Sequence, residues 1–186
     1  MAQHKGTYLY GHRYGQGTLF KRNPNEFIVW IPKNASCTIR KRFLQDPDTW
    51  EDYEIDNYII FLRDPITRWI SGFIEYLAPR YDIFCQKQKH INFDRIEFDE
   101  HTTPQYKFLP NDYLGKSKFY NIDNGGLHLF NNEYKIWDTG IPKMNRTSSD
   151  PRKKMIHKDM TSIRIPTERI KEYYSMDYKL LEACGH

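Results

Sequence analysis

Two short apolar runs constrain the fold of this 186-residue chain more than any other feature of its sequence. Residues 27–31 and residues 58–62 are continuous runs of β-branched, aromatic and leucine side chains. Such runs are typical of strands that are buried on both faces of a parallel sheet. A short polar segment and a helix signal follow each run, so the sequence predicts two strand–loop–helix units in an α/β sheet with right-handed crossovers.

The helix signal after the second run is the clearer one. Asp64 is a good N-cap residue, and Pro65 suits the first position of a helix. Apolar residues then recur at spacings of three and four as far as Leu77, which predicts a helix with one buried face. The first unit predicts the start of a helix over residues 38–44. We also expect a third strand at residues 118–122.

The rest of the chain predicts fewer regular elements. Residues 138–154 are polar and contain two prolines, which favours a long loop. Residues 166–181 predict one final amphipathic helix. We expect a single α/β domain over residues 1–186, with a central, mainly parallel sheet flanked by helices, because this length and a 39% hydrophobic content suit one core.

Composition and residue spacing argue against nucleic-acid binding, a membrane span and a metal site. A net charge of +4 is too mild to predict a nucleic-acid partner. The sequence contains no stretch of about 18 apolar residues that would predict a membrane span, and no apolar segment typical of a signal peptide follows Met1. We therefore expect a cytoplasmic protein. Three widely spaced cysteines favour a reducing compartment, and the seven histidines lack the spacing of a metal site.

The segment Pro-Lys-Asn-Ala-Ser-Cys-Thr, residues 32–38, joins the first predicted strand to its helix. The first N–H groups of a helix and its dipole favour an anion at such a place, and Lys33 adds a full positive charge. The phosphate loop of nucleotide kinases needs two glycines and a lysine at its end, whereas here both glycines are absent and the lysine comes first. That difference disfavours a kinase. The alternative interpretation of this segment is an ordinary strand-to-helix turn that binds no ligand.

The second segment, residues 63–73, begins at the predicted end of the second strand. Ligands of open α/β sheets bind at that edge, so Arg63 is well placed to meet one. Arg68 and Ser71 follow on the predicted helix. Arginine and a hydroxyl so placed can hold a phosphate by charge-assisted hydrogen bonds. The alternatives are a surface ion pair for Arg63 and pure helix capping for Asp64.

Together the two segments resemble those of sulfotransferases that use 3'-phosphoadenosine 5'-phosphosulfate (PAPS), especially the carbohydrate-sulfotransferase branch and its bacterial and viral relatives. In that family a strand–Pro-Lys–small residues–helix loop binds the 5'-phosphosulfate, and Arg-Asp-Pro-x-x-Arg-x-x-Ser-x-Tyr/Phe binds the 3'-phosphate. Three further segments are more weakly similar to that family: residues 99–105, 143–147 and 170–178. The resemblance implies a P-loop-like sulfotransferase core, the product 3'-phosphoadenosine 5'-phosphate, and no required metal.

The resemblance also implies a role for each matching residue. Lys33 would stabilise the bridging oxygen as charge develops on it. Arg63 and Ser71 would hold the 3'-phosphate, with Arg68 in support. The residues implied for the 5'-phosphosulfate are those of the first loop: Lys33, Asn34, Ala35, Ser36, Cys37 and Thr38.

The general base is the role with most candidates. His101 is the first choice because a neutral imidazole is a suitable base near pH 7, the alternative being a histidine that only shapes the acceptor pocket. Glu75 is the second, four residues after Ser71 on one helix face, unless it is simply a solvated helix residue. Asp99 and Glu100 are further candidates.

The resemblance divides the domain by role. Residues 27–78 are expected to bind PAPS, residues 79–155 to form the acceptor site and loops, and residues 156–186 to form a C-terminal helix. We expect the acceptor to be a hydroxyl-bearing glycan or small molecule. The basic residues 152–154 either close over the nucleotide or form a solvated loop. The other functions considered are an atypical P-loop kinase using ATP and magnesium, and a nucleotide-binding module without catalysis.

Overall fold

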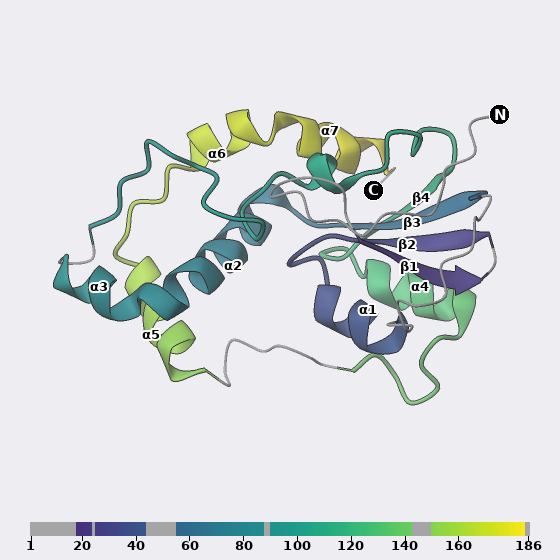
Figure 1. The fold of residues 1–186 in the computed structure, drawn as a ribbon, viewed down its shortest axis with the longest axis horizontal. Helices are drawn as coiled ribbons and strands as arrows, with labels where there is room; N and C mark the ends of the chain where they lie inside the picture. The colour runs from purple at the N-terminus through teal and green to yellow at the C-terminus, as the bar shows by residue number, and fades with distance from the viewer. Residues whose placement is uncertain (1–17, 24, 44–54, 88–89, 143–149, 185–186) are drawn as a thin grey trace.

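A four-stranded sheet with the order β1-β2-β3-β4 forms the centre of the molecule (Figure 1). The structure is a computed structural model that describes residues 18–23, 25–43, 55–87, 90–142 and 150–184. The strands are β1 (Thr18–Asn23), β2 (Glu26–Trp30), β3 (Asn57–Leu62) and β4 (Ser117–Asn121). β2, β3 and β4 are parallel and β1 pairs antiparallel with β2, so the expectation of a mainly parallel α/β sheet is confirmed.

Parallel pairing brings the ends of three strands to one edge of the sheet. Ile60 of β3 pairs with Val29 of β2 and with Phe119 of β4, and Leu62 pairs with Asn121. The chain therefore leaves β2, β3 and β4 at the same edge. The residues that follow these strands are brought together although they lie far apart in the sequence.

Seven α-helices and two short 3₁₀ segments are present in the described residues. They are α1 (Ser36–Phe43), α2 (Pro65–Leu77), η1 (Ala78–Arg80), α3 (Tyr81–Gln86), η2 (Gln105–Phe108), α4 (Gly126–Tyr134), α5 (Pro151–Met160), α6 (Thr167–Tyr173) and α7 (Ser175–Ala183). Within this part of the chain, none of the helices combines the length and the apolar character that a membrane span requires.

Helices cover both faces of the sheet. On one face, Phe108 of η2 and Leu180 of α7 pack against sheet residues that include Leu62. On the other face, Ile39 of α1 and Phe130 of α4 pack against inward side chains of the strands. Figure 1 shows α7 on one side of the sheet and α1 and α4 on the other, so the strands are buried on both faces, as their continuous apolar sequence predicts.

A separate apolar cluster surrounds α2, beside the sheet. Trp69 and Phe73 are fully buried and stack with ring centroids 4.8 Å apart. Ile156 of α5, Ile170 of α6 and Tyr174 complete the centre of this cluster. Figure 1 shows α2 running from the edge of the sheet into a part of the molecule formed with α3, α5 and α6. α2 therefore connects the sheet edge to this second cluster.

The α2 helix has the predicted bounds, residues 65–77. The side chain of Asp64 accepts a hydrogen bond of 2.8 Å from the backbone N–H of Thr67, which confirms it as the N-cap. Two other expectations were wrong. The predicted long loop over residues 138–154 ends early, because Pro151 begins α5 and Asp150 caps it through the N–H of Arg152 at 2.9 Å. The single predicted final helix is two helices.

The break between α6 and α7 lies at Tyr174. This residue has φ −100° and ψ 21°, which is not helical, and its fully buried ring belongs to the cluster around α2. Its hydroxyl donates a hydrogen bond to the carbonyl oxygen of Thr102. Packing of this one side chain therefore competes with continuation of the helix and turns the chain.

Candidate functional site

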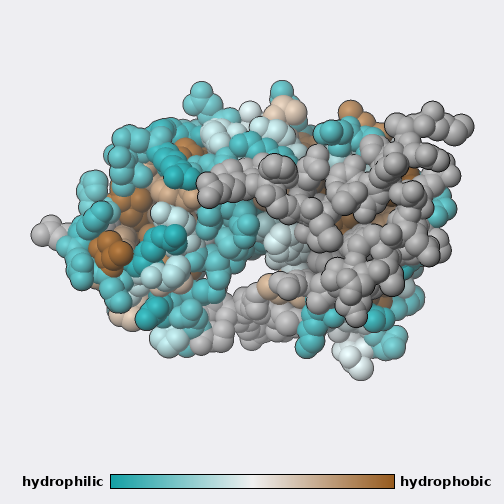
Figure 2. Space-filling view, viewed as in Figure 1, coloured by the Kyte–Doolittle hydropathy of each residue, from teal (hydrophilic) through white to brown (hydrophobic). Residues whose placement is uncertain are grey.

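A cavity of about 750 Å³ opens at the sheet edge where β2, β3 and β4 end. The space lies within the range of about 300–1,000 Å³ that is usual for small-ligand sites. Figure 2 shows this face of the molecule hollowed between its two parts. Most of the site residues predicted from sequence line the cavity: Lys33, Ala35, Ser36, Cys37, Thr38, Arg63, Ser71, Glu75 and His101. Asn34 and Arg68 are not part of this lining.

The loop between β2 and α1 has an unusual backbone. Lys33 has φ 70° and Ala35 has φ 55°, so left-handed residues stand on either side of Asn34, whose φ is negative. Alternation of this kind turns successive backbone N–H groups toward one side and makes a concave site for an anion. Left-handed conformations of residues other than glycine cost roughly 1–3 kcal/mol and persist where surrounding contacts hold them.

Asn34 supplies such a contact. Its side chain is buried, and Nδ2 donates hydrogen bonds to the Phe61 carbonyl oxygen at 2.6 Å and to Gln105 Oε1 at 2.5 Å. The sequence interpretation placed Asn34 among the cosubstrate ligands. In the structure its side chain points into the protein and fixes the loop to the end of β3, so any contact with an anion falls to its backbone.

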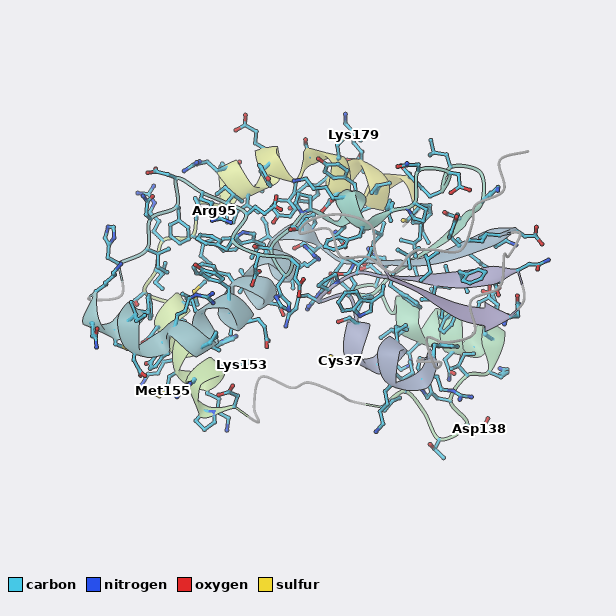
Figure 3. All side chains as sticks on the ribbon, viewed as in Figure 1. Cys37, Arg95, Asp138, Lys153, Met155 and Lys179 are labelled. Carbon is cyan, nitrogen blue, oxygen red and sulfur yellow. The ribbon has the colours of Figure 1, made fainter. Side chains whose placement is uncertain are left out.

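Lys33 and Lys153 share the carboxylate of Glu75. Lys33 Nζ lies 3.1 Å from Glu75 Oε2, and Lys153 Nζ lies 2.7 Å from Oε1 and 2.8 Å from Oε2. Burial alone would raise the pKa of Glu75, but the hydrogen bonds and charges of the two lysines hold it below its usual value. Figure 3 shows Lys153 on α5 and Cys37 on α1.

Lys153 was expected on a basic loop. It lies instead on α5, half-buried against Glu75, whereas Arg152 and Lys154 are exposed. The weakly similar segment at residues 143–147 lies outside the described residues. Lys153 is therefore the one member of the basic group at 152–154 that reaches the site in the described part of the chain.

Arg63 also faces a carboxylate. Its Nε lies 3.1 Å from Asp123 Oδ1, and Asp123 Oδ2 accepts the backbone N–H of Asp64 at 2.7 Å. Asp123 follows β4 as Lys33 follows β2 and Arg63 follows β3. Asp123 is not among the site residues predicted from the sequence, although a polar residue after the third strand of a parallel sheet is itself a signal for this edge.

The side chain of Arg68 points into the protein interior and does not line the cavity. The side chain is fully buried, Nε donates to the Pro32 carbonyl oxygen at 3.0 Å, and Nη1 donates to the Thr103 carbonyl oxygen at 2.6 Å. Burial lowers the pKa of Arg68 to about 10. Nη2 has no hydrogen-bond partner among the described residues. Arg68 therefore fastens two chain segments beneath the cavity rather than lining it.

His101 enters the cavity from the segment that precedes η2. Its Nδ1 lies 3.3 Å from Asp99 Oδ2, and its backbone N–H donates to Asp99 Oδ1 at 3.0 Å. When Nδ1 carries the proton in this pair, Nε2 has a free lone pair. Glu100 lines the same cavity. Asp99, a further candidate base from sequence, does not line the cavity and contacts His101 through both carboxylate oxygens.

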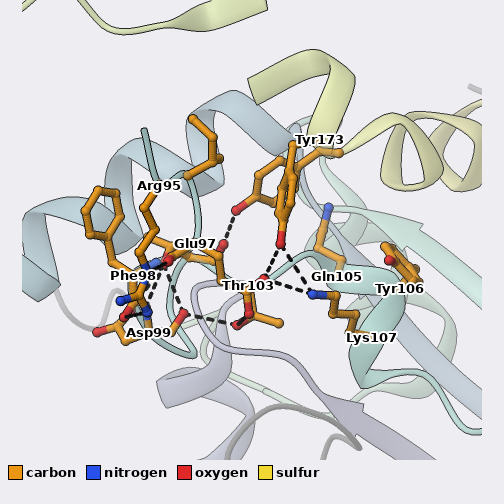
Figure 4. Close-up of polar contacts among 12 residues, drawn as sticks. Arg95, Glu97, Phe98, Asp99, Thr103, Gln105, Tyr106, Lys107 and Tyr173 are labelled. Atoms are coloured by element: carbon orange, nitrogen blue, oxygen red, sulfur yellow. Dashed lines mark hydrogen bonds and ion pairs between the residues drawn. The ribbon is translucent and has the colours of Figure 1, made fainter. Parts of the chain in front are cut away.

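Side-chain contacts hold the segment that carries His101 on its outer side (Figure 4). Glu97 accepts hydrogen bonds from Thr103 Oγ1 at 2.7 Å, from Lys107 Nζ at 2.8 Å and from the Tyr173 hydroxyl at 2.5 Å. These bonds and the lysine charge lower the pKa of Glu97 against the opposing effect of burial. The segment is thus held between Arg68 inside and Glu97 outside.

Gln105 is a residue of the site's support that was not predicted from the sequence. Its side chain is buried and contacts Asn34, Arg63 and Asp177. The signal was present in the weakly similar segments at residues 99–105 and 170–178, which the structure brings together. Among the residues described, no group of three His, Cys, Asp or Glu side chains is arranged to hold a metal ion.

Comparisons with protein-family models, with curated proteins and with solved structures find no match to this chain. The residues of the cavity and their contacts are therefore the observations that bear on function.

Proposed function

We propose that this protein is a sulfotransferase that moves a sulfuryl group from PAPS to the hydroxyl of an acceptor. The observation that carries the proposal is one cavity lined by the Lys33 loop, by Arg63 and by Ser71. These residues come from two sequence segments that would bind opposite ends of a doubly phosphorylated nucleotide. β2 and β3 are hydrogen-bonded neighbours, so the two segments start roughly 4.8 Å apart at the sheet edge, within reach of one nucleotide.

The loop at residues 33–38 suits the 5'-phosphate end. Its concave backbone and the start of α1 offer N–H groups and a favourable dipole, and Lys33 supplies a positive charge for the oxygen that leaves. Arg63 and Ser71 suit the 3'-phosphate. Lys33 pairs with Glu75 and Arg63 pairs with Asp123, so each cation must share or exchange a carboxylate when the nucleotide binds.

His101 is the better candidate for the general base. Glu75 is held as a carboxylate of lowered pKa by two lysines, which makes it a weak proton acceptor. His101 pairs with Asp99 through Nδ1, which leaves Nε2 to accept the proton of the acceptor hydroxyl as oxygen attacks sulfur. In this proposal the acceptor is a hydroxyl-bearing glycan or small molecule, and no metal takes part in the transfer.

Thermal unfolding with nucleotides tests the binding half of the proposal. We expect 3'-phosphoadenosine 5'-phosphate to raise the melting temperature without any metal, because only a ligand of the folded state stabilises it. Stabilisation by ATP with magnesium alone would instead support a kinase-like enzyme. Absence of stabilisation by either nucleotide would remove the proposal.

Transfer of labelled sulfate from PAPS to a panel of hydroxyl acceptors tests catalysis. The variant Lys33→Ala should keep the affinity for the product nucleotide within a few fold and lose roughly 100-fold or more in transfer rate, as expected for loss of a group that acts on the leaving oxygen. Lys158→Ala, an exposed lysine on α5, is the matched control. Nucleotide binding without transfer to any acceptor would favour a non-catalytic binding module.

A further inference from the structure

The side chain of Gln105 joins the two halves of the proposed nucleotide site from beneath. Nε2 donates to the Arg63 carbonyl oxygen at 2.8 Å, and Oε1 accepts the Arg63 backbone N–H at 2.9 Å. The amide therefore forms two hydrogen bonds with the backbone of Arg63, the residue that follows β3. Gln105 is fully buried, so water cannot replace these bonds.

The same amide oxygen holds the other half of the site. Gln105 Oε1 also accepts a hydrogen bond of 2.5 Å from Asn34 Nδ2. Asn34 lies between the left-handed residues Lys33 and Ala35 in the loop at residues 33–38. Asn34 Nδ2 in turn contacts the Phe61 carbonyl oxygen at 2.6 Å. The Gln105 side-chain amide thus connects Arg63 to the loop that carries Lys33.

Asp177 of α7 holds Gln105 in place. Its Oδ2 accepts the Gln105 backbone N–H at 2.7 Å and lies 3.4 Å from Gln105 Nε2, and its Oδ1 accepts the Tyr106 N–H at 2.9 Å. The carboxylate is fully buried. Burial raises the pKa of Asp177, and the three N–H donors and the nearby charge of Arg68 oppose that shift. The helix α7 is therefore connected to the loop at residues 33–38 through the buried side chains of Asp177 and Gln105.

We propose that Gln105, held by Asp177, is a positioning residue that fixes the spacing between the Lys33 loop and Arg63, so that the two phosphate groups of one nucleotide bind together. Neither residue lines the cavity, so both act through Asn34 and the Arg63 backbone. This inference rests on the proposed function, because it presupposes a ligand with phosphate groups at both ends.

The proposal predicts a particular pattern of affinities. A nucleotide held at both ends gains from effective concentration only while the two subsites keep the matching separation. Loss of the Gln105 connection should therefore weaken the bisphosphate and spare ligands that use one subsite. A variant that only loosens the fold would weaken all three nucleotides alike.

Calorimetric titration of 3'-phosphoadenosine 5'-phosphate, adenosine 5'-monophosphate and adenosine 3'-monophosphate provides the measurement. The measured quantity is the advantage of the bisphosphate, the ratio of its affinity to that of the better monophosphate. In Gln105→Met this advantage should fall about tenfold, with each monophosphate changed by no more than about twofold. Gln86→Met replaces an exposed glutamine of α3 and is the matched control, which should retain the advantage.

Asp177→Asn removes one charged acceptor at nearly constant size and should lower the advantage in the same direction. Asn34→Ser breaks the connection on the loop side and decides the matter if neither of the other variants folds. An unchanged advantage, or monophosphate affinities that fall in parallel with the bisphosphate, would overturn the inference while leaving the proposed function intact. A wild-type protein that shows no bisphosphate advantage would overturn both.

Discussion

Gly72 lies directly against the backbone of His101. A Cβ added at Gly72 would stand 2.1 Å from the His101 carbonyl oxygen and 2.6 Å from its carbonyl carbon, which no real contact allows. Ser71 lines the cavity one residue earlier on the same helix, and Glu75 lines it three residues later. The absent side chain at Gly72 therefore lets the candidate base lie beside the helix that presents Ser71 and Glu75.

The variant Gly72→Ala tests this close approach. We expect a loss of about 1–3 kcal/mol in the free energy of unfolding, because α2 or the His101 segment must move, and a larger proportional loss of transfer activity than of nucleotide affinity. Denaturant unfolding, calorimetry and the transfer assay measure the three quantities. Thr67→Ala, at an exposed position on the same helix, should change none of them appreciably. An alanine variant of wild-type stability and activity would show that the contact does not position His101.

Replacement of Arg68 separates a fastening role from direct phosphate binding. Arg68→Met leaves the carbonyl oxygens of Pro32 and Thr103 without their buried donor, so we expect a loss of roughly 2 kcal/mol or more in stability. Arg68→Lys should not restore it, because one ammonium lacks the fork that reaches both oxygens. Denaturant unfolding measures the effect. Large losses of nucleotide affinity at unchanged stability would instead favour the direct contact suggested by the sequence.

The sequence predicts the parts of the fold that depend on local signals. β2, β3 and α2 follow from continuous apolar runs and from the Asp64–Pro65 cap, and all are present. Asp150–Pro151 is the same signal, and its side-chain cap begins α5. The polar residues around it carry little apolar periodicity and by themselves favour a loop, although the helix buries Ile156 and Met160.

The site could be predicted less completely, because its support depends on contacts between distant segments. Local pattern identified Lys33, Arg63 and Ser71 as candidates, and the structure gathers them in one cavity. The local pattern could not decide whether Arg68 binds a phosphate directly or supports the site from inside the protein. In the structure Arg68 shares the buried face of α2 with Trp69 and Phe73. The contact from Asp177 to Gln105 spans 72 residues, and no periodicity of either segment encodes it.

Glu75→Gln predicts a pH-dependent change in stability. The folded protein holds the pKa of Glu75 below its ordinary value of 4.5, so its ion pairs stabilise the fold above that pH and lose their effect as pH falls through the lower folded value. About a third of the Glu75 side chain is exposed, so the free energy of unfolding of the wild-type protein should exceed that of the variant by about 0.5–1 kcal/mol at neutral pH. Thermal unfolding of both proteins from neutral to acid pH measures the difference, which should close at the acid end. A difference that grows toward acid would contradict the assigned pairs.

Substitution of His101 and its partner tests the assigned base. His101→Asn should lower the transfer rate by roughly 100- to 10,000-fold with product-nucleotide affinity unchanged, because the imidazole acts on the acceptor hydroxyl. Asp99→Asn leaves the imidazole present but loses the carboxylate that accepts from Nδ1, so a smaller loss is expected, with a changed pH–rate profile for the transfer step. His90→Ala replaces an exposed histidine as the control. If His101→Asn retains its rate while Glu75→Gln loses it, the base is the carboxylate on α2, and the two lysines that contact it must then move away before it can accept a proton.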